Sequence, residues 1–169
     1  IIEDAAHAFA SESNAYSLGS IADFSIFSLP KFFCVQAGGL LVTKARQQVV
    51  AVDQELSQYL LPRLDAEINA IVRVGEDRIS NFEYLSGLFA AIGIHPYFVP
   101  RSGEIPGVFM IECPAHVNLD EMKVHGWNHG IECSVFYGCR AFFFPIHQNL
   151  SLVDLRYIFT VFEGLLSDG

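Results

Sequence analysis

The chain has 169 residues, of which 51% are hydrophobic and 17% charged, and its formal net charge is −9. This acidic balance, with no cluster of Lys and Arg, gives no support to nucleic-acid binding, and no apolar run reaches the roughly 18 residues of a membrane-spanning helix. The four cysteines have no recurring spacing and indicate reduced thiols of a cytoplasmic protein.

The first 43 residues are predicted to form part of an α/β sheet. Three strands are expected, at Ile1–Glu3, Ala22–Ser28 and Leu40–Thr43. Pro30 cannot donate a ladder hydrogen bond and should end the second strand, and Gly38-Gly39 permits a close backbone approach or a positive φ before the third. The chain opens inside a strand, and an α/β sheet needs more strands than these. We therefore expect a fragment, the later part of a longer protein.

Residues 44–93 are predicted to be a helical connection. A helical stripe is formed by Val49, Val52, Leu56, Tyr59 and Leu60. Pro62 should break or kink this helix, and a second helical face follows at Leu64, Ile68, Ile71 and Val72. A third helical segment carries Ile79, Phe82, Leu85, Leu88 and Phe89, and Gly93 should close it.

Residues 94–169 are predicted to form a small α+β domain. Strands are expected at Tyr97–Val99, Gly107–Ile111 and Ile131–Phe136. Asn118 and Glu121 have the spacing of a capping box, which predicts a helix that ends at Gly130. Ser151 should open a last amphipathic helix, and Phe142–Phe144 is expected in a core or an interface.

An acidic residue at one strand end and a lysine just past the next suggest pyridoxal phosphate chemistry. A lysine forms a Schiff base with the cofactor aldehyde and later moves protons at the substrate Cα, while a carboxylate keeps the pyridine nitrogen protonated. Asp4 and Lys31 supply these groups, and Ser28 supplies a hydroxyl for the phosphate. The pattern alone leaves two non-catalytic interpretations open. Lys31 could be an exposed loop cation, and Asp4 could be the N-cap of a helix over residues 5–8.

Other candidate groups are weaker. His125 and His129 lie four positions apart, but no Glu follows the first histidine and the cysteines fit no common zinc finger, so no metal site is predicted. Three arginines are candidates for binding anionic substrate groups, although each is expected to be a surface cation: Arg78, Arg101 and Arg140.

Several segments closely resemble the DegT–StrS family of sugar aminotransferases, which are fold-type I, pyridoxal-phosphate-dependent enzymes. They are Ile2–Ala8, Gly19–Ser28 with Lys31, Gly38-Gly39 and the tail Pro145–Ser151. Two positions depart from the common family pattern: Ser28-Leu29-Pro30-Lys31 is shorter than usual, and Gln36-Ala37 stand where Gly-Glu is usual. The departures bear on the sugar-nucleotide substrate more than on the cofactor.

The resemblance implies a role for each matched position. Lys31 corresponds to the Schiff-base lysine, and related dehydratases carry histidine there, so it favours a transaminase. Asp4 corresponds to the partner of the pyridine nitrogen and Ser28 to a serine near the phosphate. His7 corresponds to a His-or-Gln position beside the cofactor ring, although a histidine among alanines is often simply half-buried and hydrogen-bonded. These residues would bind pyridoxal 5′-phosphate.

The resemblance also implies an architecture and a reaction. Residues 1–43 would be the later part of a cofactor-binding large domain with a mostly parallel sheet, followed by the connection at 44–93 and the small domain at 94–169. The reaction would move an amino group from an amino-acid donor to a keto sugar, by resemblance a nucleotide-linked one, in a cytoplasmic homodimer. The alternative is a truncated or non-catalytic paralogue, and we expect these 169 residues alone to be inactive.

Overall fold

The computed structural model describes residues 1–12, 16–44 and 53–167, which fall into two compact units. The first unit comprises Ile1–Glu76 and Arg101–Ile105, and the second comprises Asp77–Pro100 and Pro106–Gly169. The predicted three-part division at residues 43 and 93 stays a prediction, since compactness alone groups the helical connection partly with each unit.

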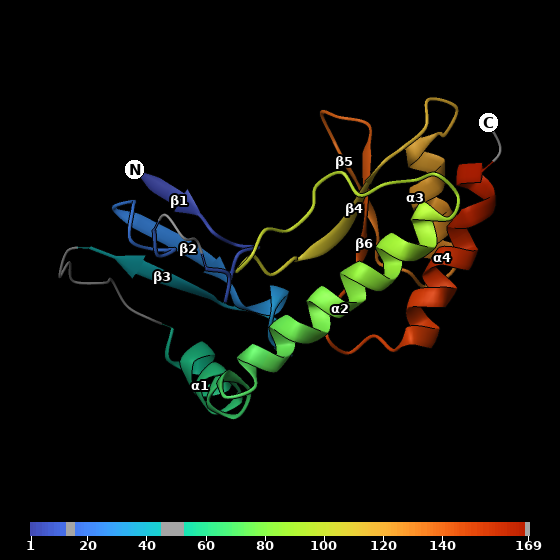
Figure 1. Ribbon diagram of the computed structural model, residues 1–169. Coiled ribbons are helices and arrows are strands. Elements are labelled where there is room, and N and C mark those ends of the chain that lie inside the picture. The colour runs from blue at the N-terminus through green and yellow to red at the C-terminus, as the bar shows by residue number, and fades with distance from the viewer. Residues whose placement is uncertain (13–15, 45–52, 168–169) are drawn as a thin grey trace. The chain divides into compact units, whose positions relative to one another are not determined.

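The first unit contains a three-stranded sheet, as the sequence predicts (Figure 1). Its strands, in the order β1-β2-β3, are β1 (Ile2–Asp4), β2 (Phe24–Ser28) and β3 (Gly39–Thr43). β1 pairs with β2 in parallel, and β2 pairs with β3 antiparallel. The register sets Asp4 opposite Ile26, and Ser28 opposite Gly39.

Alternation along β2 gives this sheet two different faces. Ser25 and Phe27 are buried on one face, whereas Ile26 on the other face is 45% exposed. Because residues paired across strands share a face, Asp4 lies on the face of Ile26 and Ser28. The face that carries Asp4 is therefore the open one.

Helix α1 (Gln54–Ile68) begins at the N-cap Asp53, whose carboxylate accepts the backbone N–H groups of Glu55 and Leu56. The predicted stripe positions 49 and 52 lie outside the described residues. Of the two effects predicted for Pro62, the break is wrong, because α1 continues through this residue, and the kink stays a prediction. Pro62 has no backbone N–H to donate within the helix. Next to it, the Arg63 guanidinium donates to the Tyr59 carbonyl oxygen at 2.8 Å and stacks on the Tyr59 ring.

Helix α2 (Ile71–Ala90) is one helix of 20 residues, so the two helical segments predicted after Pro62 are divided differently. The first of those segments spans the end of α1 and the start of α2. The second lies wholly in α2, and Gly93, with φ +78°, follows the helix as predicted. No helix in the described ranges is long and apolar enough to cross a membrane.

The first unit has its own hydrophobic core. Leu60 of α1 packs there with the buried side chains that follow β2, which are Leu29, Phe32, Phe33 and Val35. The segment Arg101–Ile105 returns to this unit from far along the chain: the Glu12 backbone N–H donates to the Gly103 carbonyl oxygen at 2.7 Å, and the Ile105 N–H donates to Ser11 Oγ at 2.9 Å.

The second unit contains an antiparallel sheet in the order β4-β6-β5, formed by β4 (Val108–Glu112), β5 (Ser134–Phe136) and β6 (Ala141–Pro145). The strand predicted at Tyr97–Val99 is wrong. Residues 97–99 form no strand, and the neighbouring Pro96 makes an isolated bridge to Ile111. The sequence reasoning missed β6, which is the central strand.

Two helices of the second unit have the predicted caps. α3 (Leu119–Asn128) starts at Asn118, whose side chain accepts the N–H groups of Asp120 and Glu121, and Gly130 follows the helix with φ +73°. α4 (Leu152–Ser167) follows Ser151, whose hydroxyl and N–H both donate to the Asp154 carboxylate. In both helices, side chains near the first turn satisfy backbone N–H groups that have no partner within the helix.

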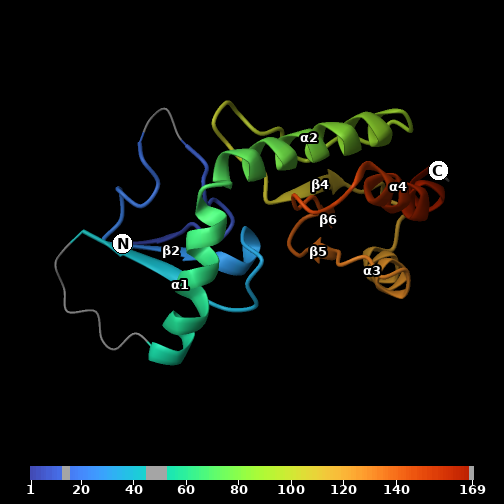
Figure 2. The same cartoon turned by 90° about the horizontal axis from the view of Figure 1, so that it is seen from below.

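The core of the second unit lies between its sheet and α2, α3 and α4 (Figures 1 and 2). Phe142 and Phe144 are completely buried there, as the sequence predicts for the phenylalanine run. Cys113 and Cys133 share this core, and burial raises the pKa of both thiols to about 11. Neither thiol is therefore a nucleophile at neutral pH.

Candidate functional site

Asp4 is the last residue of β1, and its side chain is fixed by the chain that follows. The Ala6 backbone N–H donates to Asp4 Oδ1 at 3.0 Å, and the Ala5 N–H donates to the Ile26 carbonyl oxygen of β2 at 2.9 Å. Residues 5–8 form turns instead of a helix, so the interpretation of Asp4 as a helix N-cap is wrong. The carboxylate closes an Asx-turn at the strand end and remains exposed.

The sheet sets Ser28 on the same face as Asp4, two residues further along β2 than the partner of Asp4. β1 and β2 are parallel, so their carboxyl ends lie at one edge of the sheet. In open α/β sheets this is the edge where ligands bind. The structure therefore brings the end of β1, with Asp4, and the end of β2, with Ser28, to a common edge.

Lys31 is the last residue of a single 3-10 turn, Leu29–Lys31, that follows β2 directly. Pro30 near the start of this turn has the φ that the turn needs. Leu29 and Phe32, on either side of the exposed lysine, are only 5% and 1% exposed. Two buried anchors thus hold the backbone of the turn while the Lys31 side chain faces outward.

The loop that carries Lys31 is closed by Gly38. The Leu29 N–H donates to the Gly38 carbonyl oxygen at 3.2 Å. Gly38 has φ +113°, and a Cβ there would lie 2.6 Å from Leu60 Cδ1, while a Cβ on Gly39 would lie 3.0 Å from the Phe27 carbonyl oxygen. Both features that the sequence allows at Gly38-Gly39, a positive φ and a close approach, are present.

Replacing Gly38 by alanine is expected to lower the free energy of unfolding by about 1–3 kcal/mol, since φ +113° is strained for any residue with a Cβ. Urea unfolding followed by far-UV circular dichroism measures the change. Gly87→Ala is the matched control, because that helical glycine has nothing within 4 Å of its would-be Cβ. Equal effects of the two substitutions would contradict the role given to Gly38.

His7 lies in the turns after Asp4, and its side chain is exposed. It therefore belongs to the same unit, and to the same stretch beyond β1, as the carboxylate. Asp4, His7, Ser28 and Lys31 all lie within or directly after the carboxyl ends of two adjacent parallel strands. This set combines an acid, an imidazole, a hydroxyl and an amine.

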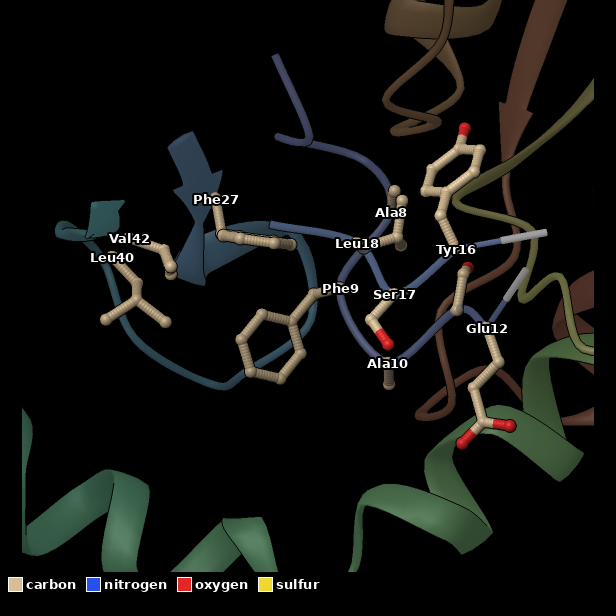
Figure 3. Close-up of a pocket in the computed structure, with 11 residues that line it drawn as sticks. Ala8, Phe9, Ala10, Glu12, Tyr16, Ser17, Leu18, Phe27, Leu40 and Val42 are labelled. Carbon is tan, nitrogen blue, oxygen red and sulfur yellow. The ribbon is translucent and has the colours of Figure 1, made fainter. Parts of the chain in front are cut away.

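A cavity of about 560 Å³ lies elsewhere in the first unit (Figure 3). Phe9, Phe27 and Val42 line one side, and Glu12 and Tyr16 lie at the other. Phe27 and Val42 point from the sheet face opposite that of Asp4 and Ser28, as strand alternation requires. The cavity is consequently not the place where Asp4 and Ser28 meet.

The second unit holds one charged group that the sequence misjudged. Arg78 was expected at the surface but is 2% exposed, and burial lowers its pKa to about 10. Its Nε donates to Gln148 Oε1 at 3.1 Å, while Asn81 Nδ2 donates to the carbonyl oxygens of Ile146 and His147. Arg78 and Asn81, one helical turn apart on α2, thus hold the segment after β6.

Arg140, His125 and His129, which the sequence analysis considered for anion or metal binding, contact backbone carbonyl oxygens. Arg140 is exposed and donates to the carbonyl oxygens of Pro114 and Val117. The rings of His125 and His129 lie 4.3 Å apart, each with a nitrogen at hydrogen-bonding distance from a backbone carbonyl oxygen. The described residues contain no group of three or more potential metal ligands.

Residues 1–56 match the family model of the DegT/DnrJ/EryC1/StrS aminotransferase family. These residues include all four candidate site positions, and over them the resemblance noted from the sequence is confirmed. No curated protein matches the chain.

Solved structures extend the likeness to the whole fold. A DegT DnrJ EryC1 StrS aminotransferase from Brucella abortus is 18% identical, with a TM-score of 0.70 over 99% of this chain and 57% of its own. A protein from Streptococcus pneumoniae assigned as a sugar aminotransferase, in its PLP form, is 20% identical, with a TM-score of 0.66 over 98% of this chain and 58% of its own. Helicobacter pylori PseC, an aminotransferase involved in the biosynthesis of pseudoaminic acid, is 16% identical, with a TM-score of 0.68 over 99% of this chain and 60% of its own.

At these identities the likeness shows the fold, which is that of fold-type I sugar aminotransferases, as predicted. The chain spans a little under three fifths of the length of two of these structures and three fifths of the third.

Proposed function

We propose that this chain carries the lysine and the pyridine-binding carboxylate of a pyridoxal-phosphate-dependent aminotransferase that acts on a sugar. The observation that supports it best is the arrangement of Asp4, Ser28 and Lys31 at the carboxyl ends of β1 and β2, inside the segment that matches the family model. The donor set fits the cofactor in kind: a carboxylate for the pyridine nitrogen, a hydroxyl for the phosphate and an amine for the aldehyde.

The protein groups would act as follows. Lys31 Nζ would bond covalently to the cofactor aldehyde, with loss of water, and after release by the amino donor would move the proton at the substrate Cα. Asp4 would hold the proton on the pyridine nitrogen, and His7 would contact the ring. The cofactor, when bound, supplies the electron sink for the bond broken at Cα.

The finer assignments belong to the same proposal. The amino donor would be an amino acid, the acceptor a keto sugar linked to a nucleotide, and the working form a cytoplasmic homodimer. A non-catalytic paralogue is not favoured, because both Asp4 and Lys31 are retained. Since the chain spans 57% of the Brucella abortus structure and 58% of the Streptococcus pneumoniae structure, we expect the 169 residues alone to bind the cofactor weakly.

Borohydride trapping tests the proposal. The complete protein is incubated with one equivalent of pyridoxal phosphate, reduced with borohydride and digested, and the modified peptide is identified by mass spectrometry. The expected product is a single phosphopyridoxyl group on Lys31. The exposed Lys44 serves as an internal control for non-specific labelling. Modification spread over several lysines would overturn the assignment. Labelling that none of the amino donors tested can prevent would overturn it as well.

A further inference from the structure

Glu3 precedes Asp4 in β1, and its side chain lies on the opposite face of the sheet. One of its oxygens, Oε2, accepts two hydrogen bonds. Ser25 Oγ donates to it at 2.6 Å, and the Gly19 backbone N–H donates to it at 3.0 Å. Ser25 is completely buried, and Gly19 adopts φ +82° in the turn before β2.

This oxygen joins β1 to β2 and to the turn that precedes β2. Glu3 and Ser25 are register partners in the parallel pair β1–β2, and Gly19 brings in the preceding turn. Both bonds end on a carboxylate oxygen, so they are charge-assisted and stronger than bonds between neutral groups. The Glu3 side chain is therefore an anchor for β1 in addition to the backbone ladder with β2.

We propose that Glu3 is a positioning residue for Asp4: by tying β1 to Ser25 and to the Gly19 turn, it fixes the strand end from which the Asp4 carboxylate reaches the pyridine nitrogen. The inference rests on the proposed function. The Ala6 N–H holds the Asp4 carboxylate in the turn after β1, and this turn can aim the carboxylate only if the strand before it is fixed.

The geometry defines three informative variants. Both bonds end on one oxygen, so the amide oxygen of Glu3→Gln can accept both, while Glu3→Ala removes both. Ser25→Ala removes one. Ser20→Ala is the matched control, because Ser20 belongs to the same turn but its hydroxyl donates to the Ser17 carbonyl oxygen instead of to Glu3.

The first measurement needs no cofactor. In the cofactor-free complete protein, hydrogen exchange of the Gly19 and Ala6 amides should accelerate at least about tenfold in Glu3→Ala, as expected when about 1.4 kcal/mol of local stability is lost. Ser20→Ala should exchange like the wild type, and Glu3→Gln, whose neutral oxygen can still accept both bonds, should accelerate exchange less than Glu3→Ala does. Acceleration at Gly19 alone would show an anchor that does not reach Asp4, and would overturn the inference.

The second measurement reads the pyridine nitrogen directly. With ¹⁵N-labelled cofactor bound, the nitrogen should lose its proton at a pH lower by about one unit or more in Glu3→Ala, since a misdirected carboxylate stabilises the charged ring less. Glu3→Gln should lie closer to the wild-type midpoint than Glu3→Ala does. In an Asp4→Asn background, adding Glu3→Ala should cause no further shift.

The outcomes separate the inference from the proposed function. If trapping labels Lys31 but the nitrogen titrates alike in wild type and Glu3→Ala, Glu3 is merely structural and the inference fails alone. If trapping labels no lysine selectively, the proposed function fails first, and the exchange result at Ala6 then describes only the strand.

Discussion

Replacing Lys31 by alanine in the complete protein is expected to lower kcat by about 10³-fold or more, the range lost with a positioned proton-transfer group. The substitution removes both the covalent attachment point and the base at the substrate Cα. It should leave the fold intact, because the side chain is exposed and the buried Leu29 and Phe32 hold the turn. Steady-state kinetics with a keto-sugar acceptor measure the effect.

Two further substitutions sharpen this test. Lys31→Arg keeps the charge but is not a nucleophile at neutral pH, so it should be as inactive as the alanine variant if the amine acts covalently. Lys44→Ala removes a lysine whose Nζ donates to the Ile21 carbonyl oxygen, and it should retain activity. A Lys31→Ala variant within tenfold of the wild type would refute the covalent role.

Replacing Phe144 by alanine should have the largest effect on stability, about 3–5 kcal/mol. The Phe144 ring is completely buried, and its centroid lies 4.9 Å from that of Phe162, 5.2 Å from Phe142 and 5.3 Å from Phe89. The rings come from β6, α4 and α2, so the truncated side chain leaves a cavity where three elements meet.

Urea unfolding of these 169 residues, followed by tryptophan fluorescence, suits this measurement, because their one tryptophan, Trp127, lies in α3 of the same unit. Phe136→Ala is the matched control. Phe136 is 50% exposed in β5, so this substitution should lower the free energy of unfolding by less than about 1 kcal/mol. If both variants unfold at the same urea concentration, Phe144 does not hold the core.

Local rules predicted much of this fold. The strands of the first unit and the caps of α3 and α4 were predicted because each depends on a few adjacent residues. Two errors arose where tertiary structure decides. Pro62 is tolerated inside α1, and β6 was missed because three consecutive phenylalanines show no alternation, although Phe142 and Phe144 face the core.

The candidate site was less accessible from pattern. A carboxylate 27 positions before a lysine is a weak signal by itself, and the family resemblance assigned the roles of Asp4 and Lys31. The structure adds that the parallel pairing of β1 and β2 sets Asp4 and Ser28 on one face. The anchor at Glu3 left no local signal, because its partners Ser25 and Gly19 lie 22 and 16 residues away. Burial of Arg78 likewise depends on the segment after β6, 70 residues later.

The return of Arg101–Ile105 to the first unit has a consequence for synthesis and dissection of the protein. This unit is discontinuous, and its contacts at Ser11 and Glu12 join residues more than 90 positions apart. On the ribosome, the first unit must wait for residue 105 before it can close these contacts. No single cut of the gene isolates it: a chain stopped at residue 76 lacks the partners of Ser11 and Glu12, and a chain that reaches them carries the first 24 residues of the second unit, Asp77–Pro100, without the remainder.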